Sequence, residues 1–217
     1  MKRALITGGT GMVGKLVLQH CLESDTVSEV ISLVRRPSGE THSKLTEKVI
    51  ADFHTYDEDE SSFQEIDAAF FCIGAYTGQV PDDVFKEITL DYAVNFAKLL
   101  KEYSPNPTLC LLSGMGADRT EKSKTSFARY KGMAENQISA LGLKFHSFRP
   151  AYIYPVTPRK EPNFMYTFSR AIYPLLKLFG DGMSIKSTEL AEAMFKAGIE
   201  GTDQEVLENK EILAFLG

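Results

Sequence analysis

Short apolar runs alternate along this chain with longer stretches in which apolar residues recur at helical spacing. The short runs cover residues 2–7, 30–34, 68–73, 108–112 and 144–148, and a further short one closes at Val49 and Ile50. Their length and their content of β-branched and aromatic residues predict strands. The run A-A-F-F-C-I at 68–73 is apolar throughout, which is expected of a parallel strand covered on both faces.

Helical patterns separate these strands. They extend to about Leu22, over 85–103 and over 127–141. A regular alternation of strand and helix implies right-handed crossovers between parallel strands. The sequence therefore predicts an α/β fold built on a doubly wound parallel sheet.

The pattern changes after Pro150. Three prolines within Y-P-V-T-P-R-K-E-P-N predict a loop, and Pro174 is expected to bend the apolar helical stretch 164–179. Ser187 or Thr188 is expected to cap a last amphipathic helix that ends at Gly198. No linker divides the chain, so we expect a single domain over 1–217, with a small C-terminal helical region, 151–217, forming much of the substrate side.

Composition narrows the classes of function. The chain has 217 residues, 43% of them hydrophobic and 24% charged, with a net charge of -5, so an obligate nucleic-acid partner is not expected. The apolar run at the N-terminus ends at Ile6, too short for a signal peptide, and no stretch reaches the length of a membrane span. We therefore expect a cytoplasmic protein with no membrane partner.

Cysteines and histidines give no sign of a metal site. Cys21, Cys72 and Cys110 show no C-x-x-C spacing and are interpreted as reduced, mostly buried thiols. His20, His42 and His54 lack the spacing of metal ligands. His146 lies in an apolar strand and is interpreted as a core residue. No metal is expected.

A glycine-rich loop follows the first strand. The segment T-G-G-T-G-M-V-G-K contains Gly9-x-Gly11-x-x-Gly14, with an additional Gly8, between a strand and a helix. At that place the pattern indicates binding of a dinucleotide pyrophosphate at the helix N-terminus. A P-loop is excluded because Leu16 stands where magnesium needs Ser or Thr. A glycine turn that binds nothing is the remaining alternative.

The end of the second strand indicates which dinucleotide is bound. It carries Arg35 and Arg36 and no acidic residue, and a guanidinium group suits the 2′-phosphate of NADP. The sequence therefore favours NADP(H) over NAD(H), although either arginine alone could be an ordinary surface charge. Asp52, just after the third strand, is placed either to accept from the adenine amino group or to cap a turn.

Several motifs together resemble one family. They are T-G-G-T-G-M-V-G, V-R-R-P, A-D-F, F-F-C-I-G, L-L-S-G-M-G-A-D, Y-K-G-x-x-E and F-R-P-A-Y-I-Y. In this combination the chain resembles the atypical short-chain dehydrogenase/reductases, in the NAD(P)-binding, NmrA-like group that includes the Tat-interacting oxidoreductase-like proteins. The resemblance covers nearly the whole chain and implies a Rossmann fold.

The resemblance also implies a serine, a tyrosine and a lysine beside the nicotinamide. Ser113 matches the serine and Lys131 the lysine, but the tyrosine position holds Phe127, which has no hydroxyl. Tyr130 precedes Lys131 directly, and adjacent helix residues do not share a face. We expect Tyr130 to point away from the face of Lys131.

Other hydroxyl groups lie near the carboxyl ends of strands, where open α/β sheets bind ligands. Tyr76, Tyr152, Tyr154 and Ser113 are all candidates to present a hydroxyl to a substrate, and the sequence does not choose among them. Ser113 and Lys131 are the candidate catalytic residues. The candidate cofactor-binding residues are Gly8, Thr10, Gly11, Met12, Val13, Gly14, Arg35, Arg36, Asp52, Phe53, Ile73, Gly74, Lys131 and Pro150.

Three functions are compatible with these features. The first is an NADP(H)-dependent oxidoreductase with an altered Ser-Tyr-Lys site, with a small-molecule substrate or effector as its partner; a homodimer is compatible with the sequence. The second is a non-catalytic protein that senses NADP(H), which the phenylalanine at position 127 motivates. The third is a nucleotide-sugar epimerase-like enzyme, although 217 residues leave little room for the larger substrate domain of such enzymes.

Overall fold

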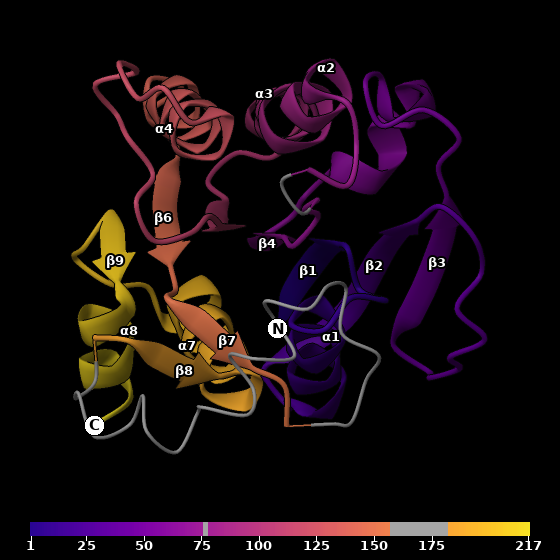
Figure 1. Cartoon of the computed structure of the whole chain (residues 1–217). Coiled ribbons are helices and arrows are strands. Elements are labelled where there is room, and N and C mark those ends of the chain that lie inside the picture. Colours follow the sequence, from indigo (N-terminus) through magenta and orange to yellow (C-terminus); the bar gives the residue numbers. More distant parts are fainter. Residues whose placement is uncertain (76–77, 157–181) are drawn as a thin grey trace.

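A computed structural model describes residues 1–75, 78–156 and 182–217. It shows a seven-stranded parallel sheet in the order β3-β2-β1-β4-β5-β6-β9, with helices on both faces (Figure 1). The strands are β1 (Lys2–Thr7), β2 (Val27–Val34), β3 (Leu45–Val49), β4 (Ala68–Phe71), β5 (Thr108–Leu112), β6 (Lys144–Arg149) and β9 (Val206–Glu208). This is the α/β, Rossmann-type fold that the sequence predicts.

The helices form two layers (Figure 1). One layer holds α2 (Asp82–Lys86), α3 (Tyr92–Tyr103) and α4 (Ser126–Ser139); the other holds α1 (Gly14–Glu23), α7 (Ser187–Glu200) and α8 (Asn209–Leu216). Short 3₁₀ turns lie at Tyr56–Glu58 and Glu60–Phe63, and one π turn, η3 (Glu87–Asp91), joins α2 to α3. Among the described residues no helix is long and apolar enough to cross a membrane.

Each central strand contributes to two cores, one on each face of the sheet. In β4, Ala69 and Phe71 join the core under α3 and α4, whereas Ala68 and Phe70 join the core under α1 and α7. All four side chains are at most 2% exposed. Burial on both faces explains why this strand has no polar alternation in the sequence.

The structure corrects several predicted boundaries. The fourth strand ends at Phe71 and not at Ile73, and the predicted helix 85–103 contains the π turn. The helix predicted to end at Gly198 continues to Glu200 and ends at Gly201, whose φ is +84°. Gly198 instead allows α7 to pack on the sheet, since a Cβ there would lie 2.5 Å from Cζ of Phe70.

Within residues 182–217 the chain continues beyond α7, which is therefore not the last helix. Lys186, not Ser187 or Thr188, is its N-cap residue, and its N–H donates to the Glu189 carboxylate at 2.9 Å. Strand β9 and helix α8 follow α7, and a small parallel sheet pairs β7 (Tyr152–Tyr154) with β8 (Ser184–Lys186). The predicted proline loop beyond residue 156 and the helical stretch 164–179 lie outside the described residues.

Candidate functional site

The glycine loop after β1 folds tightly onto itself. Gly8 has a φ of +79°, and a Cβ there would lie 2.6 Å from the carbonyl group of Cys72. A Cβ at Gly14 would lie 2.2 Å from the carbonyl oxygen of Gly8, and the Gly11 N–H donates to that same oxygen at 2.9 Å. These contacts explain why glycine stands at both ends of the motif.

The loop presents its tip at the carboxyl edge of the sheet. Thr10 and Gly11 are exposed and Met12 is half-buried, whereas Val13 and Gly14 are buried where α1 begins. The positive end of the α1 dipole therefore faces this edge of the sheet, and the exposed loop residues Thr10 and Gly11 lie in front of it. This arrangement fits the pyrophosphate of a dinucleotide.

The end of β2 places cations beside this loop. Arg35 and Arg36 follow the last strand residue and are exposed. Lys15, in the first turn of α1, forms an ion pair with Glu40 at 2.7 Å, which ties the segment after Arg36 to the glycine loop. Two exposed guanidinium groups therefore stand at this edge of the sheet.

The turn after β3 packs against α3. Burial raises the pKa of Tyr92 to about 12; the hydrogen bond to Glu87 and the charges of Glu87 and Asp52 add to this, and the charge of Arg35 opposes it. The Asp52 carboxylate accepts from the His54 N–H at 2.8 Å, the turn-capping role that the sequence left open. Phe53 is buried, with its ring 5.8 Å from that of Tyr92, so only its backbone is available to a ligand.

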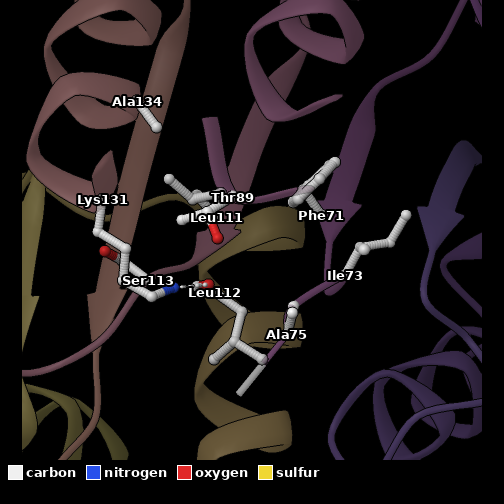
Figure 2. A pocket seen from close by; sticks show the side chains of 10 residues that line it. Phe71, Ile73, Ala75, Thr89, Leu111, Leu112, Ser113, Lys131 and Ala134 are labelled. Carbon is white, nitrogen blue, oxygen red and sulfur yellow. Dashed lines mark hydrogen bonds between the residues drawn. The ribbon is translucent and has the colours of Figure 1, made fainter. Parts of the chain in front are cut away.

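A pocket lies at the ends of β4 and β5 (Figure 2). Ser113 and Lys131 lie side by side on one wall, Ile73 lies on the opposite wall, and Thr89 lies between them. A Cβ on Gly8 would lie 2.9 Å from the Ile73 nitrogen, so the glycine loop leads directly to this wall. The structure thus brings the glycine loop, Ile73, Gly74, Ser113 and Lys131 onto one continuous edge.

Lys131 is the charged residue of this pocket. Its Nζ donates to the Leu112 carbonyl oxygen at 3.4 Å (Figure 2). Burial lowers the pKa of Lys131 to about 8, against an opposing effect of Glu135. An amine with a pKa near neutrality can hold or release a proton under physiological conditions.

Phe127 occupies the position predicted for a catalytic tyrosine. Its ring centre lies 5.4 Å from Nζ of Lys131, and its Cζ would be 2.7 Å from a Cβ on Gly114. Tyr130 instead donates its hydroxyl to Asp82 at 2.8 Å and is 9% exposed. The prediction that Tyr130 points away from Lys131 is confirmed.

The other candidate hydroxyls differ in their surroundings. The Ser113 hydroxyl donates to the buried carboxylate of Glu135 at 2.6 Å. Tyr152 and Tyr154 are half-buried in β7, and Tyr76 lies outside the described residues. Their roles, and those of the candidate cofactor contacts, remain predictions.

One candidate contact is buried, and one pocket residue was missed by the sequence interpretation. Pro150, a candidate cofactor contact, is buried, and its carbonyl oxygen accepts from the Met115 N–H at 2.9 Å, which joins the ends of β5 and β6. Thr89 was not a candidate, because its place in the pocket depends on the π turn, and such turns have no sequence signal as clear as a cap or a glycine motif.

Three further expectations concerned the histidines, the cysteines and metal ligands. His146 is 6% exposed and its Nδ1 lies 2.8 Å from the Gln204 carbonyl oxygen, which confirms a core role. Cys21, Cys72 and Cys110 are free thiols. Within 1–75, 78–156 and 182–217, no group of His, Cys, Asp and Glu side chains is arranged to hold a metal ion.

Comparison with known proteins agrees with this geometry. A family model described as NAD(P)H-binding matches residues 8–197. Protein HTATIP2 of Rattus norvegicus is 28% identical over 98% of this chain and 88% of its own length. Protein fmp52, mitochondrial, of Aspergillus clavatus is 25% identical over 95% of this chain and 91% of its own length.

Solved structures share the fold at low identity. Gre2 of Candida albicans in complex with NADPH has a TM-score of 0.73 at 14% identity, covering 96% of this chain and 78% of its own. WbmH of Bordetella bronchiseptica in complex with NAD+ has a TM-score of 0.71 at 18% identity, covering 96% and 75%. Given the match over 8–197 and the HTATIP2 relationship, the chain belongs to the NAD(P)H-binding family, in the atypical group related to the short-chain dehydrogenase/reductases.

Proposed function

We propose that this protein is an NADP(H)-dependent oxidoreductase that works without the usual catalytic tyrosine. The observation that carries the proposal is the continuous edge from the glycine loop, past Ile73, to the pocket of Ser113 and Lys131. The exposed pair Arg35–Arg36 at the far end of that edge supports NADP(H) over NAD(H).

The altered pocket implies a different source for the proton. When bound, NADPH supplies a hydride, and reduction of a carbonyl or quinone also needs a proton. Phe127 cannot provide one, and the hydroxyl of Tyr130 is engaged by Asp82. Lys131, whose pKa is lowered by burial to about 8, is placed in the pocket as a proton donor near neutral pH.

Cofactor preference is tested by binding. The Arg35→Ala variant should bind NADPH about tenfold more weakly and NADH almost unchanged, because a charge-assisted contact to the 2′-phosphate is lost. Isothermal titration of both cofactors measures this, with Lys122→Ala as a control at an exposed cation of another loop. Equal affinity for NADH and NADPH, unaltered by Arg35→Ala, would show that the preference is wrong.

A second candidate is a non-catalytic sensor of NADP(H), favoured by the phenylalanine at position 127 beside Lys131. Oxidation of NADPH with a panel of aldehydes, ketones and quinones separates the two. Turnover that is lost in Lys131→Ala rejects the sensor. Tight binding of NADPH without turnover across the panel supports it.

A further inference from the structure

A fully buried carboxylate lies behind the pocket. Glu135 is 0% exposed and lies one helical turn after Lys131 on α4. It accepts from the hydroxyls of Ser113 and Ser147 at 2.6 and 2.8 Å, and from Nε of Arg119 at 2.9 Å. Arg149 donates to both of its oxygens. A buried charge requires this degree of compensation.

The two arginines are shared with further carboxylates. Arg119 also pairs with Glu205 at 2.6 Å, and Arg149 pairs with Glu208 at 2.8 Å. The cluster of these two arginines with Glu135, Glu205 and Glu208 therefore holds two positive and three negative charges. One negative charge remains in excess, and Lys131 is the cation that faces the pocket from the same helix side as Glu135.

The hydrogen bond from Ser113 fixes the direction of its proton. A short bond to a carboxylate is stronger than one to a neutral acceptor, so the Ser113 proton remains on the Glu135 side at 2.6 Å. The Ser113 oxygen then meets the pocket through its lone pairs. A ligand group beside it must be a hydrogen-bond donor, such as a hydroxyl or an amide N–H.

We propose that Glu135 is a positioning residue of the pocket: it fixes Ser113 as a hydrogen-bond acceptor toward the ligand and supplies the negative charge that offsets the Lys131 ammonium. The proposal rests on the proposed function, because it describes how the same site is prepared for a cofactor or substrate. It assigns to the ligand a donor group at Ser113, which is the reverse of a serine that donates to a substrate carbonyl oxygen.

The charges that act on Lys131 come from one direction. The other pocket-lining residues are uncharged: Phe71, Ile73, Gly74, Ala75, Thr89, Leu111, Leu112, Ser113 and Ala134. Behind them lie Glu135 on α4, Arg119 after β5 and Arg149 on β6. Burial lowers the pKa of Lys131 and Glu135 raises it, so changes in the cluster should move this pKa with a sign that depends on the charge removed.

The test measures the Lys131 pKa in the protein without cofactor, by carbon-13 NMR of labelled lysine side chains assigned with Lys131→Met. Glu135→Gln should lower the pKa by about 0.5–1 unit, because a negative charge is lost. Arg119→Gln should raise it by a similar amount, because less of the Glu135 charge is neutralised. Glu192→Gln, which removes a carboxylate from a surface ion pair with Lys196 on α7, is the control and should leave it unchanged.

Opposite shifts cannot arise from a general loss of packing, so they separate positioning from a purely structural role. Shifts of the same sign, or no shift, would overturn the proposal. If Glu135→Gln fails to fold, the rise of the Lys131 pKa in Arg119→Gln decides the question. Glu135→Asp, which keeps the negative charge, should leave the Lys131 pKa near its value in the unmodified protein.

The hydroxyl is tested by a double-mutant cycle on NADPH affinity. Glu135→Gln should weaken NADPH binding about fivefold in the unmodified protein and much less in the Ser113→Ala background, because it acts through Ser113. Equal effects in both backgrounds would overturn the role assigned to Ser113. The NMR result does not require a cofactor, so a protein that binds no NADPH but shows opposite pKa shifts would contradict the proposed function and not the role of Glu135.

Discussion

The glycines at the two ends of the loop after β1 are required by contacts within the chain itself. Gly14 lies where a Cβ would overlap the carbonyl oxygen of Gly8. Gly39, by contrast, has a φ of +81° but no atom within 4 Å of an added Cβ. Substitutions at Gly14 and Gly39 therefore separate the effect of a close contact from the effect of a positive φ.

We expect Gly14→Ala to weaken NADPH binding by more than about tenfold, because the loop must open to admit the methyl group and the cradle for the pyrophosphate is lost. Gly39→Ala should cost roughly 1 kcal/mol of stability from its positive φ and leave the affinity unchanged. Fluorescence titration with NADPH and urea unfolding measure the two quantities. An unaltered affinity in Gly14→Ala would contradict the assignment of the loop.

The surroundings of Lys131 show which contacts of a single residue could be predicted from the sequence and which could not. The family resemblance implied that Phe127 stands at the tyrosine position, and the 100° step of the helix predicted correctly that Tyr130 faces away from Lys131. Nothing in the sequence showed that the Ser113 hydroxyl is bound by Glu135. That contact joins residues of β5 and α4, and it depends on how the helix docks.

At the scale of the element, α4 presents three surfaces in five residues. Lys131 faces the pocket and Glu135 enters the buried cluster. Gly132 lies against the loop after β5, where an added Cβ would be 1.8 Å from the Asp118 carbonyl oxygen. The helix can approach this loop only because position 132 has no side chain.

Replacing Gly132 should therefore reverse the usual effect of alanine in a helix. Gly→Ala within a helix normally stabilises by roughly 0.5–1 kcal/mol, but Gly132→Ala should destabilise by about 2 kcal/mol because α4 must move away from the loop. Urea unfolding checks this, with Gln137→Ala at an exposed position of the same helix as a control. A more stable Gly132→Ala variant would show that the loop yields easily.

Strands and helices with long apolar runs were predicted well, whereas short strands were not. The central strands were recognised because both of their faces are buried, as in Ala68–Phe71. Strand β9 was missed, since Val206–Glu208 has three residues and one fully buried side chain, Leu207. It pairs with β6 over Ser147–Arg149, and the ion pair of Arg149 with Glu208 joins the same two strands across a long separation in sequence.

At the scale of the whole molecule, the Glu135 cluster joins β5, α4, β6 and β9 and should govern stability in acid. Burial raises the pKa of Glu135, but hydrogen bonds from Arg149, Ser113, Arg119 and Ser147 lower it below its usual value. A depressed carboxyl pKa contributes stability above the pKa of the unfolded chain, and this contribution is lost as the pH falls through the folded value.

We therefore expect the free energy of unfolding to fall more steeply for the unmodified protein than for Glu135→Gln between about pH 5 and about pH 3. Urea unfolding across this range provides the measurement. Glu192→Gln should follow the unmodified curve, because its ion pair is at the surface. Parallel curves for Glu135→Gln would mean that the carboxyl group titrates alike in the folded and unfolded chain.

The seven-stranded sheet has a kinetic consequence, because every pairing within it is parallel. No two neighbouring strands can close as a hairpin, so each pairing must wait for a crossover to form. β1 must find β4 across the whole of α1, β2 and β3. Such a high contact order predicts refolding over seconds and not milliseconds. Until the helices cover the sheet, the apolar run Ala68–Phe71 stays exposed and can associate with other unfolded chains.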